Sequence, residues 1–479
     1  MVTRYINKDL NGGATGGDGL TPATAYSGAG NGGKDAIDQT IGDFNGPNAV
    51  GGEIIFASAG NPIYRCEVQG EGVNQNGTAL DPFVWKTDGE STDGKLNKIR
   101  VTSMDDANDI DIASGDSYQW NGPNGNGEYY LTIGDSVTVV PVEVKNGVID
   151  GYYMGTSADD DRTSRGQQRG AVGSLEDGQF GWGNTDGLSG NTVYVKFSDN
   201  PSNHVIEINR RVDNAFVGFN YHEYEDFEFY GGSPVSVATR TGWKFRRCLS
   251  AYPDFRGFQQ QTGDAVFISC VGFWAGHSFG NALAGNQNFY QCTDVYAHIF
   301  SLNGASSTLT MRNCISAEGE AGGLDNSSGG TIDEDYNLWF PYMEAAGGAL
   351  SYPSGNINWD KTGDNSIPPQ ALGTITEQGD LTDPQFSNLQ PDTLDLDGLR
   401  LLSASPAATT GTDWWTAANE DEPLDYFGNA LVGDQITNPP MGAFFTFVSS
   451  GSPTLTTPYS IGTNNGPLFT IKTSDTLAT

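Results

Sequence analysis

Four of the five cysteines recur at a constant interval along the chain. They are Cys248, Cys270, Cys292 and Cys314, and three positions before each stands a large apolar residue: Phe245, Phe267, Phe289 and Met311. Self-similarity at a short fixed period is typical of a solenoid, whose units each contact only their neighbours. The repeated segments are short, rich in aromatic and β-branched residues, and broken by Gly and Asn, which favours strands over helices. The sequence therefore predicts a parallel β-coil with rungs of about 22 residues.

The position just before each cysteine is predicted to be a bend. The alternation of apolar and polar residues changes parity there, and such a change turns the following side chains to the other face of the strand. In the preceding rung Phe227 takes the place of the cysteine. The predicted bend residues are Arg247, Ser269, Gln291 and Asn313.

The spacing of the four thiols excludes a zinc site made from all of them. Equivalent positions in stacked strands lie about 4.8 Å apart, so four rungs span roughly 14 Å. Zinc needs every sulfur at about 2.3 Å from one ion. Disulfides between adjacent rungs are geometrically conceivable, but we interpret the column as buried free thiols that act as small hydrophobic side chains.

The net charge of −35 disfavours several classes of partner. Phosphate binding needs clustered Lys and Arg, so nucleic acid and anionic membrane surfaces fit poorly, whereas neutral or cationic partners fit well. No segment approaches the roughly 20 apolar residues of a membrane span, which argues against membrane insertion. The first residues, MVTRYINKDLNGG, contain no apolar stretch of signal-peptide length. We therefore expect a protein made and released in the cytoplasm, unless a leader has been removed.

Several motifs occur in a fixed order along the chain. Residues 1–68 contain DGLTPATAYS and GGEIIFASAGNPIY, residues 92–103 are TDGKLNKIRVTS, and residues 191–208 are NTVYVKFSDNPSNHVIEI. DEDYNLW follows at 333–339, and DPQFSNLQ, LLSASPAATTGT and GNALVGDQ lie between 383 and 435. In this order they resemble right-handed parallel β-helix proteins of the broad pectate-lyase-like class. The resemblance implies the fold, but this architecture hosts lyases, hydrolases, isomerases and non-enzymatic virion parts.

Together these features predict an all-β chain: a right-handed parallel β-helix solenoid, an irregular loop-rich insertion and a short C-terminal β tail. The insertion is acidic and Gly-rich, and insertions in solenoids gather on one face, often the binding face. The tail is rich in Thr and Ser and too short for a core of its own. The expected parts are residues 1–103 (cap and first rungs), 104–190 (insertion), 191–345 (regular rungs), 346–447 (last turns and exit) and 448–479 (tail).

A column of polar residues follows the cysteines by six or seven positions. If each rung continues alike, its members stack along one edge with neighbours about 5 Å apart. A carboxylate–imidazole cluster of this kind suits acid–base chemistry or a metal, although hydrated turn residues would give the same pattern. The candidate catalytic residues are Asp254, His277, His298 and Glu320.

A second column, Tyr252, Trp274 and Tyr296, lies beside the first in the sequence. Facing outward, these rings would offer flat surfaces to the sugars of a polysaccharide; facing inward, they would form an aromatic stack in the core. Trp is rarely fully buried, which slightly favours a surface groove. The other candidate substrate-binding residues are Arg246 and Arg256, which belong to a local basic cluster.

No catalytic signature of a β-helix enzyme family matches this chain residue by residue. In lyases of that fold, as the resemblance implies, an Arg or Lys removes a proton while Ca²⁺ or another cation neutralises a carboxylate. The acidic runs at 105–111 and 159–161 could bind Ca²⁺ through oxygen ligands, but neither has the spacing of a known calcium loop. A glycosidase needs two carboxylates roughly 5 to 9 Å apart. Asp254, Asp264, Glu223 and Glu225 are candidates for that pair by position alone.

Three functions remain open. The first is a virion-surface protein like a phage tailspike, made in the host cytoplasm, that binds host-surface polysaccharide. Spikes of this class are usually homotrimers joined to other virion proteins, as the resemblance implies. The second is an extracellular polysaccharide lyase or glycoside hydrolase that uses the groove of the coil, and the third is a purely structural or decorating virion protein. The sequence favours the first and leaves open whether the chain is an enzyme.

Overall fold

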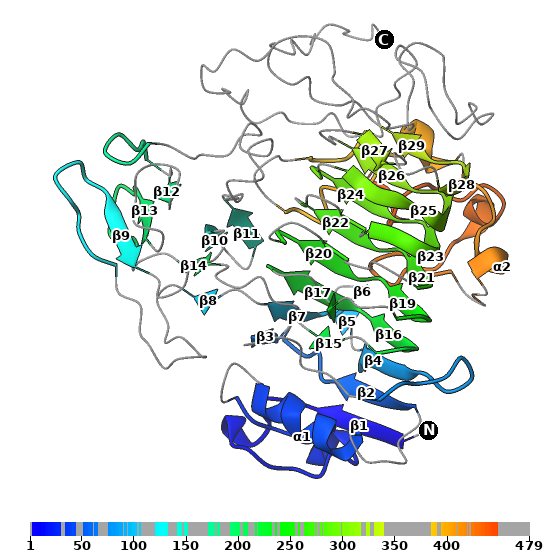
Figure 1. Ribbon diagram of the computed structural model, residues 1–479, viewed down its shortest axis with the longest axis horizontal. Coiled ribbons are helices and arrows are strands. Elements are labelled where there is room, and N and C mark those ends of the chain that lie inside the picture. Colours follow the sequence, from blue (N-terminus) through cyan, green and yellow to red (C-terminus); the bar gives the residue numbers. More distant parts are fainter. Residues whose placement is uncertain are drawn as a thin grey trace, which may run out of the picture.

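The computed structural model is mostly β and contains two large sheets whose described strand pairs are all parallel (Figure 1). It describes most of residues 2–102, 219–339 and 385–448, together with the strands between residues 105 and 217. Residues 341–384 and 449–479 are not among the described residues, so the predicted tail lies almost wholly outside them. Within the described part, no helix is long and apolar enough to cross a membrane.

The strands of the two large sheets alternate along the chain. The first sheet runs in the order β1 (Val2–Ile6), β2 (Gly52–Phe56), β4 (Phe83–Thr87), β16 (His222–Glu225), β19 (Trp243–Arg246), β21 (Ala265–Ile268), β23 (Asn281–Tyr290), β25 (Ile299–Arg312) and β27 (Gly322–Asp325), with β28 (Thr331–Asp335) also paired to β25. The second sheet runs in the order β3 (Ile63–Arg65), β7 (Ile99–Thr102), β17 (Phe227–Tyr230), β20 (Leu249–Ala251), β22 (Val271–Phe273), β24 (Thr293–Val295), β26 (Ile315–Ala317) and β29 (Leu338–Trp339). Each turn of the regular part therefore gives one strand to each sheet, as a β-solenoid requires.

Register partners in the first sheet lie one repeat apart in the chain. Phe245 is opposite Phe267, and Phe267 is opposite Phe289. The offset is one residue shorter where Glu223 faces Lys244. The parallel stacking predicted from the cysteine interval is thereby confirmed for these strands.

The predicted bends are present between the two sheets. Arg247, Ser269, Gln291 and Asn313 have φ angles of 53°, 51°, 59° and 56°, which are uncommon for residues other than Gly. Asp226 occupies the same place in the preceding rung, with φ 65°. The four cysteines that follow these bends are fully buried and unpaired, which confirms their interpretation as free thiols.

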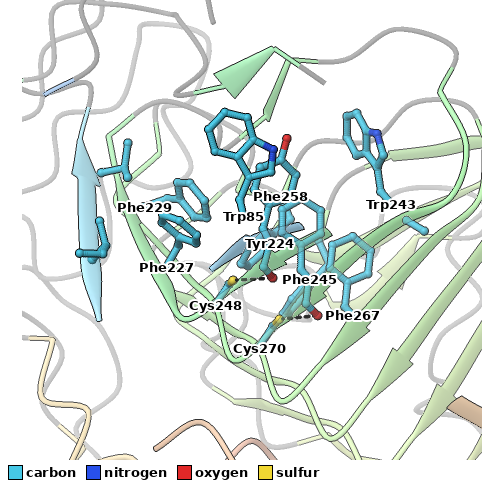
Figure 2. Packing of buried hydrophobic residues seen from close by; sticks show 14 of the residues in the cluster. Trp85, Tyr224, Phe227, Phe229, Trp243, Phe245, Cys248, Phe258, Phe267 and Cys270 are labelled. Carbon is cyan, nitrogen blue, oxygen red and sulfur yellow. Dashed lines mark hydrogen bonds between the residues drawn. The ribbon is translucent and has the colours of Figure 1, made fainter. Parts of the chain in front are cut away.

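Aromatic rings of successive rungs stack inside the coil (Figure 2). The rings of Phe245 and Phe267 are 5.3 Å apart and almost parallel, and those of Phe267 and Phe289 are 5.0 Å apart. Beside this row, the thiol of Cys248 donates a hydrogen bond to the Tyr224 carbonyl at 3.4 Å, and that of Cys270 donates to the Phe245 carbonyl at 3.5 Å. Each ring thus obtains its packing from the neighbouring rung.

The interior is closed at its N-terminal end by helix α1 (Lys34–Phe44) (Figure 1). Ile37, Ile41 and Phe44 of this helix belong to the same buried cluster as the aromatic rows. An open coil end exposes unpaired strand edges, so a covering element is needed there. The short helices in the described part are η1 (Leu10–Gly13), η2 (Pro22–Thr24), η7 (Pro406–Ala408), α2 (Trp415–Ala418) and η8 (Gly433–Ile436).

The described residues between 385 and 448, here called the C-terminal segment, return along the outside of the coil. Three bend side chains bind its backbone. Ser269 Oγ donates to the carbonyl of Leu424 at 2.7 Å, and Asn313 Nδ2 donates to that of Thr412 at 2.7 Å. Gln291 Nε2 donates to the carbonyl of Pro440 at 2.5 Å.

Apolar side chains of the C-terminal segment also cover the outer faces of both sheets. Leu249, Val271 and Val295 of the second sheet share a buried cluster with the segment. On the first sheet, the ring of Tyr290 stacks on that of Trp414 with centroids 5.8 Å apart. Both sheets are therefore buried on two faces near the bends, which is usual for parallel sheets.

Residues of the predicted insertion and of the segment that follows it form two small antiparallel sheets beside the coil (Figure 1). One consists of β11 (Val148–Gly151), β10 (Pro141–Lys145), β14 (Val205–Ile208) and β8 (Asp105–Asp106); the other consists of β12 (Phe180–Trp182), β13 (Thr192–Val195) and β9 (Tyr129–Thr132). The prediction that 191–208 is a rung of the coil is wrong, because β13 and β14 pair with these strands. Local alternation is the same for either kind of strand and does not identify the pairing partner. The other predicted limits between parts stay predictions.

The remaining strand pairs are β5 (Ser91–Thr92) with β6 (Lys95–Leu96) and β15 (Phe216–Val217) with β18 (Val235–Ser236).

Removing one ring of the interior row should lower stability strongly. Phe267 is 1% exposed and packs between Phe245 and Phe289. We expect Phe267→Ala to reduce the free energy of unfolding by about 3 to 5 kcal/mol, measured by urea denaturation. Leu80→Ala is the control, because Leu80 is 97% exposed and its loss should change stability by less than about 0.5 kcal/mol. Equal effects of the two substitutions would contradict the stacked interior.

Candidate functional site

The predicted catalytic column lies outside the described residues. Asp254, His277, His298 and Glu320 all fall there, as do Trp274 and Arg256. Their mutual distances therefore stay a prediction. The described neighbours on both sides of these positions are in register, since Tyr252 donates its N–H to the Phe273 carbonyl and Phe258 donates to the Ser278 carbonyl.

The two described members of the aromatic column, Tyr252 and Tyr296, are core residues. They are 1% and 7% exposed, and each packs edge-on against Phe273, with ring centroids 5.4 and 5.8 Å apart. The same buried cluster includes Leu394 and Tyr426 of the C-terminal segment. The aromatic column was predicted either to face outward or to pack in the core. These two rings pack in the core, because the C-terminal segment covers them. Neither can present its face to a sugar.

Arg246 belongs to a charged cluster on the outer face of the first sheet. Its Nη1 lies 2.6 Å from Glu223 Oε2 and 2.8 Å from Glu225 Oε1. Its Nη2 lies 3.1 Å from Oε1 of Glu420, which also accepts a hydrogen bond from Lys244 Nζ at 2.9 Å. We call these five residues the charged cluster. Glu420 comes from the C-terminal segment, so the cluster joins that segment to the coil.

The electrostatics of the charged cluster disfavour acid–base chemistry. Burial alone would lower the pKa of Arg246, but Glu223, Glu225 and Glu420 together raise it above its ordinary value. Burial would raise the pKa of Glu420, yet Arg246 and Lys244 lower it. Arg246 therefore keeps its proton and Glu420 stays ionised. The guanidinium of Arg246, which was predicted to bind substrate, is already paired with three carboxylates. The charged cluster therefore holds the C-terminal segment against the coil.

A second group of ion pairs, which is more deeply buried, stands at the bend between β16 and β17. Asp226 is 4% exposed, and its carboxylate accepts hydrogen bonds from Arg247 Nη2 at 2.8 Å and Lys98 Nζ at 3.1 Å. Burial raises the pKa of Asp226, but the two cations outweigh it and the pKa is lowered. Lys98 Nζ also donates to the Arg247 carbonyl at 2.7 Å. This group links two bend residues of positive φ, Asp226 and Arg247, and is mostly buried.

Other sequence candidates in the described part have structural partners. Asp264, proposed as one of a glycosidase pair, accepts the backbone N–H of Asn286 in β23 at 2.8 Å and so links neighbouring rungs. Within the described residues no group of three or more His, Cys, Asp or Glu side chains is placed to hold a metal ion. Asp105 and Asp106 form β8, whereas the other members of the acidic runs lie outside the described part, so Ca²⁺ binding stays a prediction.

Two groups were not found from the sequence. Glu420 was missed because nothing local links it to Arg246, which lies far away in the chain. A second interior row, Phe258, Phe279 and Phe300, has ring centroids 5.4 and 4.6 Å apart. This row could have been predicted from the sequence, because its phenylalanines recur at a constant interval that is one residue shorter than the cysteine interval.

Comparisons with known proteins give little further. No protein-family model matches the chain, and none of the curated proteins matches it. Among solved structures, a chain described as a glycoside hydrolase superposes with a TM-score of 0.42 at 9% sequence identity. The superposition covers 71% of this chain and 83% of that one. A likeness of this degree supports no statement about function.

His222 should make the protein less stable in mild acid. Burial lowers its pKa from 6.5 to about 4, although Nε2 lies 3.0 Å from the Gln75 carbonyl. The unfolded chain therefore binds a proton at a higher pH than the folded chain. The stabilisation is complete above about pH 6.5 and is lost as the pH falls through about 4.

The measurement is urea denaturation at about pH 7 and about pH 4.5. Between these values His222 should account for a loss of about 2 to 3 kcal/mol in unfolding free energy. His222→Gln keeps a donor but does not titrate, so its stability should fall by that much less over the same interval. Parallel losses in the two proteins would show that His222 is not buried in its neutral form.

Proposed function

We propose that this chain binds a neutral polysaccharide along a right-handed parallel β-helix and cleaves it by acid–base chemistry. The observation that favours this is the register of the rungs. Residues such as Phe245, Phe267 and Phe289 face each other strand by strand, so side chains at equivalent positions repeat in a straight row about 4.8 Å apart. A rigid row of that kind suits a linear polymer. The net charge of −35 favours a neutral chain over a polyanion.

The substrate row is assigned to the third stretch of each rung, which follows the second sheet and leads back to the first. The contacts described for the C-terminal segment lie on the two sheets and along the bends between them. The third stretch contains the interior row Phe258, Phe279 and Phe300. Polar residues that precede those rings are therefore the proposed site.

Counting back from the described phenylalanine row refines the candidate column. His277 and His298 each precede a ring of this row, Phe279 and Phe300, by two residues. Phe279 donates its N–H to the Phe300 carbonyl, so these two rings occupy matching places in adjacent rungs, and the two histidines stand at the same distance from them in the sequence. We propose them as the acid–base pair, because imidazole is the side chain best suited to exchange a proton near neutral pH.

The two carboxylates of the column take flanking places in this scheme. Ile299 and Gly322 are register partners. In the sequence His298 comes one residue before Ile299, whereas Glu320 comes two residues before Gly322, so the two positions differ by one residue. Asp254 precedes Phe258 by four residues. Carboxylates beside a histidine pair would orient the imidazoles and raise their basicity.

A place on a virion surface is a separate proposal. It rests on the resemblance of the coil to tailspike-like proteins and on the Thr- and Ser-rich residues 448–479, which suit packing against other copies. A trimer that resists denaturing detergent would support a spike that joins other virion proteins. A monomer would support a free enzyme.

The direct test is to incubate the protein with neutral and acidic polysaccharides and follow polymer length by size-exclusion chromatography. We expect a neutral polymer to be shortened. His277→Ala and His298→Ala should each slow this at least about 100-fold without changing the melting temperature. His204→Ala is the matched control, since His204 lies outside the column. A neutral polymer lacks the carboxyl group that β-elimination requires, so its shortening should add water and give no ultraviolet absorbance. Absorbance of an unsaturated sugar end from an acidic polymer would identify a lyase and contradict the proposal.

Other outcomes would overturn the proposal. Retention of a polymer without shortening would leave a receptor-binding protein, and no interaction with any polymer would favour a purely structural role. Shortening that neither histidine substitution affects would place the chemistry elsewhere on the coil.

A further inference from the structure

Two tyrosines lie side by side on the small sheet formed by β12, β13 and β9. Tyr130 of β9 and Tyr194 of β13 are direct register partners, and their ring centroids are 5.6 Å apart with 32° between the ring planes. Both side chains are only half-buried. Figure 1 shows these strands to one side of the coil.

The core of this small sheet is on its other face. Leu131, Val193 and Val195 alternate with the two tyrosines and are 2%, 0% and 3% exposed. The sheet thus buries its apolar face without the tyrosines. Their rings form a tilted aromatic pair on the opposite face.

The row that contains the rings ends in small or polar residues. Gly181 of β12 is the register partner of Tyr194, so no side chain stands beside that ring on this strand. Asn121 pairs with Tyr130 through an antiparallel bridge and brings an amide to the other end. The row Asn121–Tyr130–Tyr194–Gly181, here called the tyrosine platform, combines a stacking surface with a hydrogen-bonding group.

We propose that the tyrosine platform binds sugar rings of a neutral polysaccharide. Aromatic faces stack on the C–H faces of pyranose rings, and amides hydrogen-bond the hydroxyl groups. Two tyrosines offer at most about 300 to 500 Å², whereas a protein partner needs about 800 Å², so the platform is the size of a sugar ligand. The net charge of −35 excludes a polyanion as the favoured ligand. This inference rests on the proposed function, because it gives the same polymer a holding point outside the coil.

The test measures binding separately from cleavage. The full-length protein is run on native gels that contain dextran, soluble starch, xylan or, as polyanions, alginate and polygalacturonate, and the dissociation constant follows from the retardation. We expect retention by at least one neutral polymer. Tyr130→Ala and Tyr194→Ala should each weaken it about tenfold, while Tyr194→Trp should restore it.

Two further variants make the result specific. Tyr5→Ala is the matched control, because Tyr5 is also a half-buried tyrosine in a strand but belongs to β1. Gly181→Thr introduces a strand-forming residue and should block the platform while both tyrosines remain. Melting temperatures of all variants should agree within a few degrees, since a cross-strand pair contributes little to the stability of a large protein.

The outcomes distinguish this inference from the proposed function. Retention that depends on the tyrosines but no polymer shortening would keep the platform and remove the enzyme. Retention unchanged in both tyrosine variants, retention only by the polyanions, or no retention at all would overturn the platform, whatever the histidine variants do.

Discussion

In-register stacking of parallel strands is the constraint on which the rest of this structure depends. One rung has too few apolar residues to bury an interior, so each ring takes its contacts from the next rung, as Phe267 does between Phe245 and Phe289. Such rows form only if every rung returns to the same place. The left-handed bends at Ser269 and Gln291 turn each rung in the same way. They also direct polar side chains towards the C-terminal segment, whose backbone accepts hydrogen bonds from them.

The C-terminal segment follows from the same constraint. Stacked parallel strands leave apolar rows on the outside as well as the inside, and Leu249 and Val271 would face water without a cover. The segment supplies that cover over many rungs, and the charged cluster fixes it through Glu420 and Arg246. Breaking one partner of a buried ion pair costs more than the intact pair contributes, because the other charge is left unpaired. The cluster therefore secures one position of the segment rather than performing chemistry.

The cysteine interval was enough to predict the parallel pairing, the bends and the buried thiols, because these depend on contacts one repeat away. It did not reveal the row of Phe258 and its equivalents. The interval between these phenylalanines is one residue shorter than the cysteine interval, so the phenylalanines do not stay at a constant distance from the cysteines in the sequence. Nor could it foresee that Tyr252 is covered by Leu394, since that contact joins distant parts of the chain. The strands in 191–208 were misassigned because alternation specifies a half-buried strand and not its partner.

The two proposed sites, the histidine pair on the coil and the tyrosine platform on the insertion, have different roles, and the fold explains the difference. In the proposed scheme the coil gives the acid–base groups a rigid row, but its outer faces near the bends are already occupied. The insertion is free of that repeat, so its sheet can present Tyr130 and Tyr194 as a pair without disturbing any rung. If both proposals hold, a polymer long enough to reach both places would bind the second one intramolecularly, at an effective concentration set by the polymer between them. Affinity should then rise with polymer length although no new contact is made, and a short oligosaccharide would occupy either place alone.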